Sequence, residues 1–185
     1  MRNFSRRLTL LTLVLAQGVI WVNGSAVMIA LPQIQRELDA SVDELQWFVN
    51  GFLIATVIVL LPAARWGDRF GRRRMLVIGA AVFALGSLAA ALAPNSDVLL
   101  DARIAQGAGA GLLAPSTASL LINAFPAEEH GRVLGVWGAS ASVAFVAGPL
   151  LGGLVTQSLG WPWVFAICVP VALAVIVLAF VAVPE

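Results

Sequence analysis

Long apolar stretches separated by short charged segments dominate this chain. Positions free of Asp, Glu, Arg and His form five intervals, 8–35, 45–64, 75–96, 104–127 and 133–184. Each of the first four is long enough to cross a bilayer once, because roughly 20 helical residues span the hydrocarbon core. The fifth is about twice that length, and Gly160 and Pro162 near its middle interrupt the apolar pattern. The pattern therefore predicts six transmembrane helices.

The six predicted spans take up nearly the whole chain. They cover about residues 8–32, 45–65, 75–95, 102–125, 133–156 and 163–183. We therefore expect an all-α membrane protein with a single six-helix transmembrane domain over residues 1–185. Such a chain leaves no room for a separate soluble catalytic domain or a DNA-binding module.

The composition points to the same class of protein. Hydrophobic residues make up 60% of the 185 residues and charged residues 11%, against roughly 25% charged in soluble domains. The net charge of +1 predicts no nucleic-acid partner. Since the chain has one cysteine and one histidine, neither an internal disulfide nor a metal site or other cofactor is expected. Cys168 is expected to pack as a small core residue. His130 is expected in a solvated loop, too far from Ser140 and Ser142 to form a protease site with them.

The distribution of arginine predicts how the chain sits in the membrane. All eleven basic residues are arginine, and nine of them precede the first span or lie between spans two and three or four and five: Arg2, Arg6, Arg7, Arg65, Arg69, Arg72, Arg73, Arg74 and Arg132. Short basic loops stay in the cytoplasm, so we expect a cytoplasmic amino terminus, and six crossings return Glu185 to the same side. A basic start is also typical of a cleaved signal peptide, but the run from Leu8 to Pro32 exceeds the usual apolar core of about 7–15 residues.

The loop between the second and third predicted spans carries the strongest motif. Residues 64–74 read Ala-Arg-Trp-Gly-Asp-Arg-Phe-Gly-Arg-Arg-Arg. Anchoring by positive charge explains the arginines, but it does not explain Asp68 or the glycines at 67 and 71. Glycine allows a tight turn and close backbone approach, and Asp68 and Arg72 are spaced to pair across one helical turn. The Asp68 carboxylate can also bind the positively polarised amino end of a neighbouring helix. We therefore expect Asp68 to make a contact that can close and open.

This loop resembles the cytoplasmic motif of the major facilitator superfamily, Gly-x-x-x-Asp-Arg-x-Gly-Arg-Arg, with Ala64 in place of the first glycine. The resemblance implies that Asp68 binds the amino end of a helix in the other half of a transporter. It further implies a cytoplasmic gate made of Gly67, Asp68, Arg69, Gly71, Arg72 and Arg73.

Three further segments are similar to motifs of the same family. Residues 100–109 resemble the fourth-helix pattern Arg-x-x-Gln-Gly-x-Gly, and residues 144–153 resemble the fifth-helix antiporter motif. Residues 30–34 and 161–170 resemble drug:proton antiporters of the QacA/EmrB type. The resemblance implies two three-helix units in inverted repeat and proton-driven export of small amphipathic compounds.

Six residues are candidates for lining a cavity or for coupling: Gln17, Trp21, Asn23, Ser25, Arg103 and Gln106. Trp21, Ser25 and Met28 are spaced to share one helical face, with Gln17 a turn earlier, and this stripe either lines a cavity or packs against neighbouring helices. Arg103 either extends to the outer interface or faces the cavity beside Gln106, where the resemblance implies a part in proton transfer.

Asn23 departs from the family pattern, because relatives usually have Asp at this position. Asn carries no titratable proton, and no carboxylate lies within any of the six predicted spans. If that acid couples transport in relatives, coupling here must use another group or be altered.

Glycine pairs predict where helices approach closely. The antiporter motif comprises Gly148, Pro149, Gly152 and Gly153. Its glycines at 148 and 152 permit close backbone packing in lipid, as do Gly107 and Gly111, and Pro149 is expected to kink its helix.

Six helices make only half of the transporter that the resemblance implies. Since alternating access needs a second half, the chain is either a fragment or split gene product, or a homodimer in which Asp68 reaches the partner. The expected partners are the lipid bilayer, a small-molecule substrate, protons and this second half or second copy. The expected location is the cell membrane, most simply a bacterial inner membrane. The alternative function is a non-transporting membrane scaffold or regulatory protein.

Overall fold

The computed structural model describes residues 2–183, with side chains from Arg6 onward, so the side chain of Arg2 and the whole of Glu185 lie outside the described residues. Within that range the chain forms helices joined by short turns. They are α1 (Arg2–Leu38), α2 (Val42–Phe70), α3 (Arg72–Ala91), α4 (Ser96–Ala124), the 3-10 helix η1 (Ala127–Glu129), α5 (His130–Leu159), α6 (Pro162–Ala166) and α7 (Cys168–Ala182). Only Ile167 separates α6 from α7, so the two form one span and the described chain has six helical segments.

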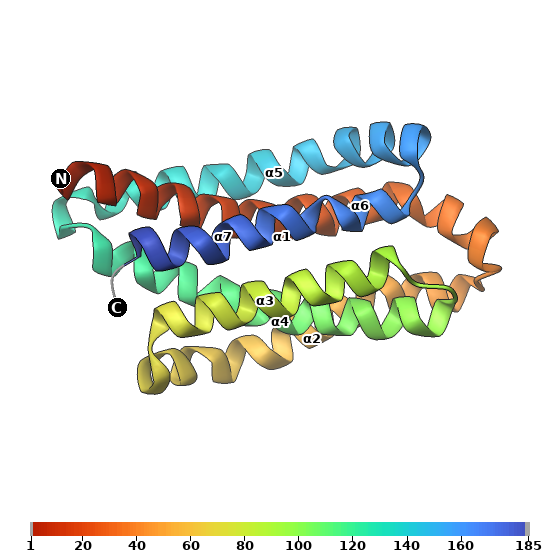
Figure 1. Ribbon diagram of the computed structural model, residues 1–185, viewed down its shortest axis with the longest axis horizontal. Coiled ribbons are helices and arrows are strands. Elements are labelled where there is room, and N and C mark those ends of the chain that lie inside the picture. The colour runs from red at the N-terminus through yellow and green to blue at the C-terminus, as the bar shows by residue number, and fades with distance from the viewer. Residues whose placement is uncertain (1, 184–185) are drawn as a thin grey trace.

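The long helices lie side by side along the longest axis of the molecule (Figure 1). Helix α1 packs mainly on α5, α4 packs mainly on α2 and α3, and α3 also contacts α7. The first and last described helices meet at one end of the bundle, where the Thr9 hydroxyl donates to the Ala182 carbonyl at 2.7 Å. Both ends of the described chain therefore lie at the same end of the bundle (Figure 1).

Polar residues at the turns determine where several helices begin. Ser41 accepts a hydrogen bond from the Glu44 backbone N–H, and the Glu44 carboxylate accepts one from the Ser41 N–H at 2.7 Å. This reciprocal pair satisfies backbone donors that a helix start leaves open. Asn95 caps α4 by accepting from the Val98 N–H at 3.0 Å. Gly71, with φ +98°, joins α2 to α3 in a conformation that glycine adopts without steric cost.

Most helices extend several residues beyond the predicted spans, and two helix ends have a clear reason in the sequence. Helix α1 continues through Pro32 to Leu38, because one missing backbone hydrogen bond does not stop a helix that is followed by good helix-forming residues. Helix α3 ends at Ala91, four residues before the predicted limit of 95, because Pro94 disfavours helical backbone in the residue before it.

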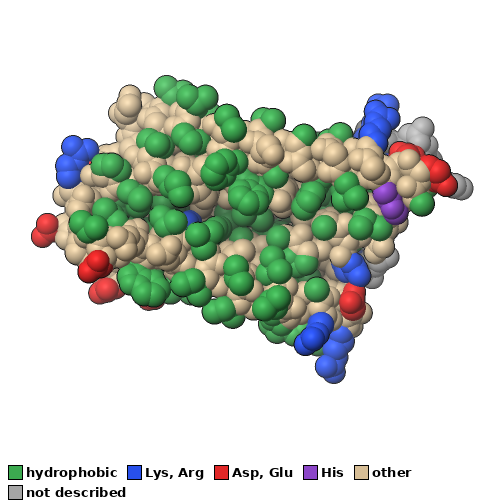
Figure 2. Space-filling view, turned by 180° about the vertical axis from the view of Figure 1, so that it is seen from behind, with side chains coloured by type: hydrophobic (Ala, Val, Ile, Leu, Met, Phe, Trp, Pro, Cys, Tyr) green, Lys and Arg blue, Asp and Glu red, His purple; other side chains and the backbone are tan. Residues whose placement is uncertain are grey.

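The prediction of an all-α chain is confirmed for residues 2–183. Five of the helical segments are long and apolar enough to cross a membrane, and α4 is not among them. Its first turns carry Asp97, Asp101 and Arg103, and it buries more residues than any other helix for which burial is described. Figure 2 shows charged side chains gathered at the two ends of the molecule, with hydrophobic side chains spread over the surface between.

Two large buried hydrophobic clusters fill most of the bundle, beside a small third one of Ala63, Met75 and Leu112. One lies toward the end that holds the termini and includes Leu13, Leu76 and Phe83. The other lies toward the opposite end and includes Val27 and Phe48. In α1, α3 and α4, buried polar residues lie between the two clusters.

Glycines bring three pairs of helices into close contact, and one of them is α3–α4, which meets through Gly79, Gly86 and Gly109. A Cβ atom added to Gly152 of α5 would lie 2.8 Å from the Cα atom of Ala26 in α1, and one added to Gly148 would overlap the Ser25 hydroxyl. A Cβ atom added to Gly111 of α4 would lie 2.6 Å from the carbonyl oxygen of Thr56 in α2. The pairs α1–α5 and α2–α4 therefore meet through backbone, which only glycine permits at these positions.

The other two residues of the antiporter motif lie outside this contact. An added Cβ at Gly153 would meet only Ile29 Cγ2, at an ordinary 3.8 Å. Pro149 is exposed, and α5 continues through it without interruption. The kink expected at Pro149 stays a prediction.

Gly152→Ala should loosen the contact of α5 with α1, whereas Gly153→Ala should not. Both substitutions add one methyl group to the same helix, but only the first meets backbone, and overpacking costs about 1–3 kcal/mol. Gly153→Ala is the control, and it should stabilise α5 by up to about 1 kcal/mol, because alanine has a higher helix propensity than glycine. Thermal unfolding of the full-length protein in detergent measures both, and equal midpoints for the two variants would contradict the close contact at Gly152.

Candidate functional site

Four polar side chains form a buried layer between the two hydrophobic clusters. They are Asn23 of α1, Ser87 of α3, and Arg103 and Gln106 of α4, and none is more than 1% exposed. We call these four residues the polar layer. A buried guanidinium is costly in a membrane unless its donors are satisfied, so its hydrogen bonds decide how this layer is built.

Arg103 is the centre of the polar layer. Its Nε donates to the Phe48 carbonyl of α2 at 2.9 Å. One terminal nitrogen donates to Asn23 Oδ1 at 2.8 Å and to Gln106 Oε1 at 2.7 Å. One side chain thus connects α4 with α1 and α2.

The remaining contacts extend the polar layer to two more helices. Gln106 Nε2 donates to the Ser87 hydroxyl at 2.7 Å, and Ser87 donates to the Phe83 carbonyl. Asn23 Nδ2 lies 3.5 Å from the sulfur of Cys168, a weak acceptor at the start of α7. Cys168 is buried in the hydrophobic core.

Aromatic rings complete the surroundings of Arg103. Its guanidinium carbon lies 4.3 Å from the centre of the Phe52 ring and 5.8 Å from that of Phe165. Ring faces attract cations, and more so away from water. The hydrogen-bond acceptors found for Arg103 are all neutral. Among the described residues, the positive charge is therefore held by carbonyl groups and aromatic rings.

The structure places the predicted cavity residues in different surroundings. Arg103 is buried, so it does not extend to the outer interface. Gln17 is 6% exposed, and its Oε1 has no hydrogen-bond partner among residues 6–183. Ser25 is buried against Gly148, whereas Trp21 is exposed and meets the Phe145 ring edge-on at 6.0 Å. Gln17 and Ser25 of this stripe are therefore buried among neighbouring helices, whereas Trp21 lies on an open face.

The residues of the predicted cytoplasmic gate lie together where α2 turns into α3. Arg72 donates to Asp68 Oδ1 at 2.6 Å, and the Asp68 side chain is 64% exposed. Asp68 and Arg72 line a cavity of about 460 Å³ with Gly67, Gly71 and the last residues of α4.

Two other gate arginines lie on apolar or backbone partners. Arg69 lies over the Phe70 ring, and Arg73 donates to the Val183 carbonyl at 3.3 Å. Arg73 also lies over the ring of Phe180 in α7, at 5.8 Å. The segment that holds the predicted gate residues, 67–73, is called the gate segment. Through Arg73 it contacts the end of the last helix.

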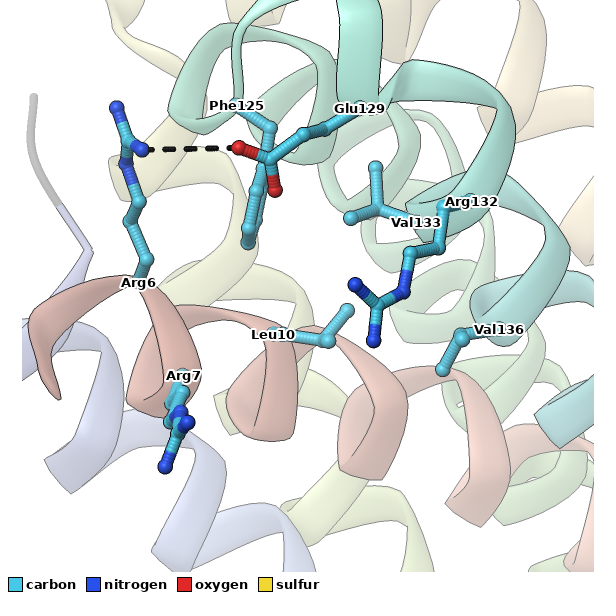
Figure 3. A pocket seen from close by; sticks show the side chains of 8 residues that line it. All are labelled: Arg6, Arg7, Leu10, Phe125, Glu129, Arg132, Val133 and Val136. Carbon is cyan, nitrogen blue, oxygen red and sulfur yellow. Dashed lines mark ion pairs between the residues drawn. The ribbon is translucent and has the colours of Figure 1, made fainter. Parts of the chain in front are cut away.

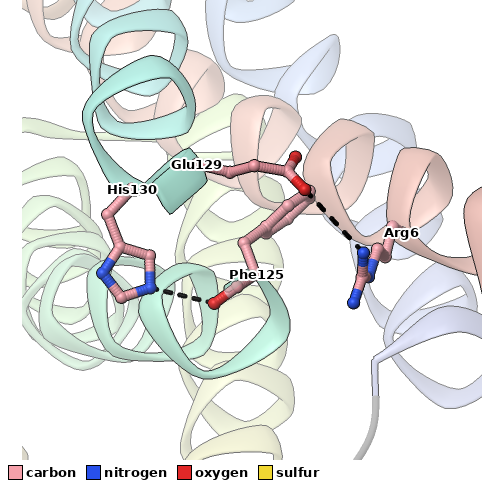
Figure 4. A network of polar contacts seen from close by, with 4 residues as sticks. All are labelled: Arg6, Phe125, Glu129 and His130. Atoms are coloured by element: carbon pink, nitrogen blue, oxygen red, sulfur yellow. Dashed lines mark hydrogen bonds and ion pairs between the residues drawn. The ribbon is translucent and has the colours of Figure 1, made fainter. Parts of the chain in front are cut away.

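His130 differs from the sequence expectation of a solvated loop. It is half-buried at the start of α5, and its Nε2 lies 3.0 Å from the Ile122 carbonyl. The same nitrogen lies 2.9 Å from the Phe125 carbonyl (Figure 4). Carbonyl groups at the end of a helix lack partners within the helix. His130 therefore caps the end of α4, a role that depends on the sharp turn between α4 and α5.

A bundle with five helical segments that are long and apolar enough to span a bilayer is typical of α-helical membrane proteins. The sequence model of the Major Facilitator Superfamily matches residues 13–185, and the chain belongs to this family. It is therefore a multi-pass membrane protein.

Several known proteins are similar to the chain. Multidrug resistance protein Stp of Mycobacterium tuberculosis is 38% identical over 99% of this chain and 34% of its own length. The tetracenomycin C resistance and export protein of Streptomyces glaucescens is 37% identical over 94% of this chain and 32% of its own length. The chain thus spans about a third of the length of these relatives.

Solved structures show the same fold. The proton:xylose symporter XylE, bound to 6-bromo-6-deoxy-D-glucose, aligns with 100% of this chain and 46% of its own, with a TM-score of 0.88 and 18% identity. At that identity the similarity establishes the fold alone.

Arg103→Met should destabilise the bundle, whereas Arg36→Met should not. The first leaves three buried acceptors without their charged donor, and each unsatisfied group costs about 1–3 kcal/mol. Arg36 is exposed at the end of α1, so its replacement removes the same charge without affecting a buried contact. Chemical or thermal unfolding in detergent compares them, and a stable Arg103→Met variant would show that the hydrogen bonds of Arg103 do not hold the helices together.

Proposed function

We propose that the chain is the amino-terminal half of a transporter that exports small amphipathic compounds with energy from a proton gradient. The supporting observation is that relatives named for multidrug resistance and for tetracenomycin C export align over 94% or more of this chain. Both termini are proposed to face the cytoplasm, in agreement with the nine arginines predicted on that side. A second six-helix half or a second copy completes the pathway.

The helix contacts support an inverted repeat of α1–α3 and α4–α7. If α1 corresponds to α4, α2 to α5 and α3 to α6 with α7, the α1–α5 contact corresponds to the α4–α2 contact. Both contacts are extensive. Each also uses glycines four residues apart, at Gly148 and Gly152 in one and at Gly107 and Gly111 in the other. Inverted repeats of three helices are nested within each six-helix half of transporters of this family.

The gate segment has the properties that a contact with a second half needs. Asp68 is mostly exposed although it pairs with Arg72. An exposed pair of this kind contributes little to stability, so exchanging Arg72 for the positive end of another helix has a small cost. We propose that Asp68 makes this exchange when the cytoplasmic side closes.

Proton coupling is the part of the proposal that Asn23 affects most. Asn23 supplies Arg103 with a neutral oxygen, and the polar layer contains no carboxylate. We propose that the coupling group lies outside the polar layer. A non-transporting scaffold is the alternative function, and a folded protein without transport would favour it.

Asp68→Asn should abolish substrate-driven proton flux in liposomes that contain the full-length protein. The neutral amide loses most of the attraction to a helix end, so the cytoplasmic side no longer closes. Asp101→Asn is the matched control and should keep the flux. It also removes an exposed acid, but Asp101 lies near the start of α4, whereas Asp68 lies beside the end of α4. Wild-type flux in both variants would contradict the gate, and absence of flux from the folded wild type would favour the scaffold.

Asn23→Asp should make transport depend on pH over a new range, because it puts a carboxylate within hydrogen-bond distance of Arg103. Asn50→Asp introduces the same group at an exposed site in α2 and serves as the control. Transport rates of both variants and of wild type, measured across pH, test the idea. Identical pH profiles for all three would indicate that position 23 takes no part in coupling.

A further inference from the structure

A pocket lined by arginines opens where α1 and α5 begin. Arg6, Arg7 and Leu10 of α1 line it together with Glu129, Arg132 and Val136 (Figure 3). Its volume is about 250 Å³. Three positive side chains and one negative side chain leave the pocket with a net charge of +2, which favours an anionic ligand.

The arginines of this pocket are incompletely neutralised. Arg6 and Glu129 form a loose, partly exposed ion pair at 3.9 Å. Arg7 and Arg132 have no ion-pair or hydrogen-bond partner among the described residues. In Figure 3, Arg6 extends from α1 toward Glu129, Arg132 extends from α5 toward Leu10, and Arg7 points away from Glu129. Guanidinium groups bind phosphate oxygens through paired hydrogen bonds.

The position of the pocket favours a lipid over a soluble anion. Arg7 and Arg132 directly precede the spans predicted to begin at residues 8 and 133, at the depth of the headgroups. Leu10 and Val136 form apolar walls one turn deeper. Another turn along the same helices, Val14 and Ser140 belong to a largely apolar groove of about 430 Å³ between α1, α5 and α7. The arginines at the helix starts match the phosphate group of a lipid. The apolar side chains one and two turns deeper match its hydrocarbon chain.

We propose that the pocket binds the headgroup of an anionic phospholipid, with Arg6 and Arg132 around the phosphate, Arg7 adding positive charge at its edge, and an acyl chain against the apolar groove. Glu129 competes for Arg6 and limits the affinity. The occupied pocket joins the beginnings of α1 and α5 through one ligand. This binding is independent of the transport activity proposed above, so either can fail without the other.

Native mass spectrometry of the full-length protein from mixed vesicles tests the proposal. The vesicles contain equal amounts of phosphatidylglycerol and phosphatidylcholine with the same acyl chains. We expect preferential retention of phosphatidylglycerol and about a fivefold loss of that preference in Arg132→Gln, as estimated for one arginine at an anionic membrane surface. Arg65→Gln, which removes an exposed arginine of α2 outside the pocket, should keep the preference.

Glu129→Gln separates loss of binding from loss of folding. It removes the competing carboxylate, so retention of phosphatidylglycerol should rise, a gain that misfolding does not produce. Equal retention of the two lipids by wild type, or equal loss in Arg132→Gln and Arg65→Gln, would overturn the proposal. Displacement of the lipid by excess inorganic phosphate would overturn it in favour of a soluble anion site.

Discussion

The buried charge of Arg103 is the constraint on which the arrangement of the helices depends. A guanidinium inside a membrane protein needs acceptors for its donors, and here they come from Phe48 of α2, Asn23 of α1 and Gln106 of α4 itself. These bonds form only if α1, α2 and α4 hold one relative depth and rotation. Hydrophobic contacts alone are less selective, since apolar surfaces of similar shape pack in more than one register. The polar layer therefore specifies one arrangement of the bundle.

Glycine makes the geometry of the polar layer attainable. Gly107 and Gly111 let α4 approach the backbone of α2, and Thr56 strengthens this contact by donating to the Gly107 carbonyl at 3.1 Å. With α2 held this close, the Phe48 carbonyl comes within 2.9 Å of Arg103. The helix therefore combines small residues that bring backbones together with long polar residues that connect them. This combination also explains why α4 is not among the segments that are apolar enough to cross a membrane by composition.

The sequence predicts the helices better than it predicts their partners. Intervals without charge locate the helical segments, and glycine spacing locates the close contacts. The hydrogen bonds of Arg103 are harder to predict, because a backbone carbonyl such as that of Phe48 has no sequence signal and Ser87 resembles any small residue of an apolar run. From the sequence alone, His130 belongs to a loop. Its cap on α4 is not predictable, because the cap depends on a turn that residue types do not specify. Ser25 and Trp21 share a spacing but face different neighbours, since α1 is packed on several sides.

A polar layer that connects α1, α2, α3, α4 and α7 implies where movement occurs. Changing the relative positions of these helices would expose or unpair the charge of Arg103, which is costly, so we expect them to move as one body. Helices α2 and α5 are the least buried of the candidate spans, and Trp21 and Phe145 leave part of the α1–α5 face open. Asp68 is exposed at the end of α2. If the chain is half of a transporter, as proposed above, the second half would meet this bundle along α2 and α5. Alternating access would then change the contact between two bodies more than the packing within this one.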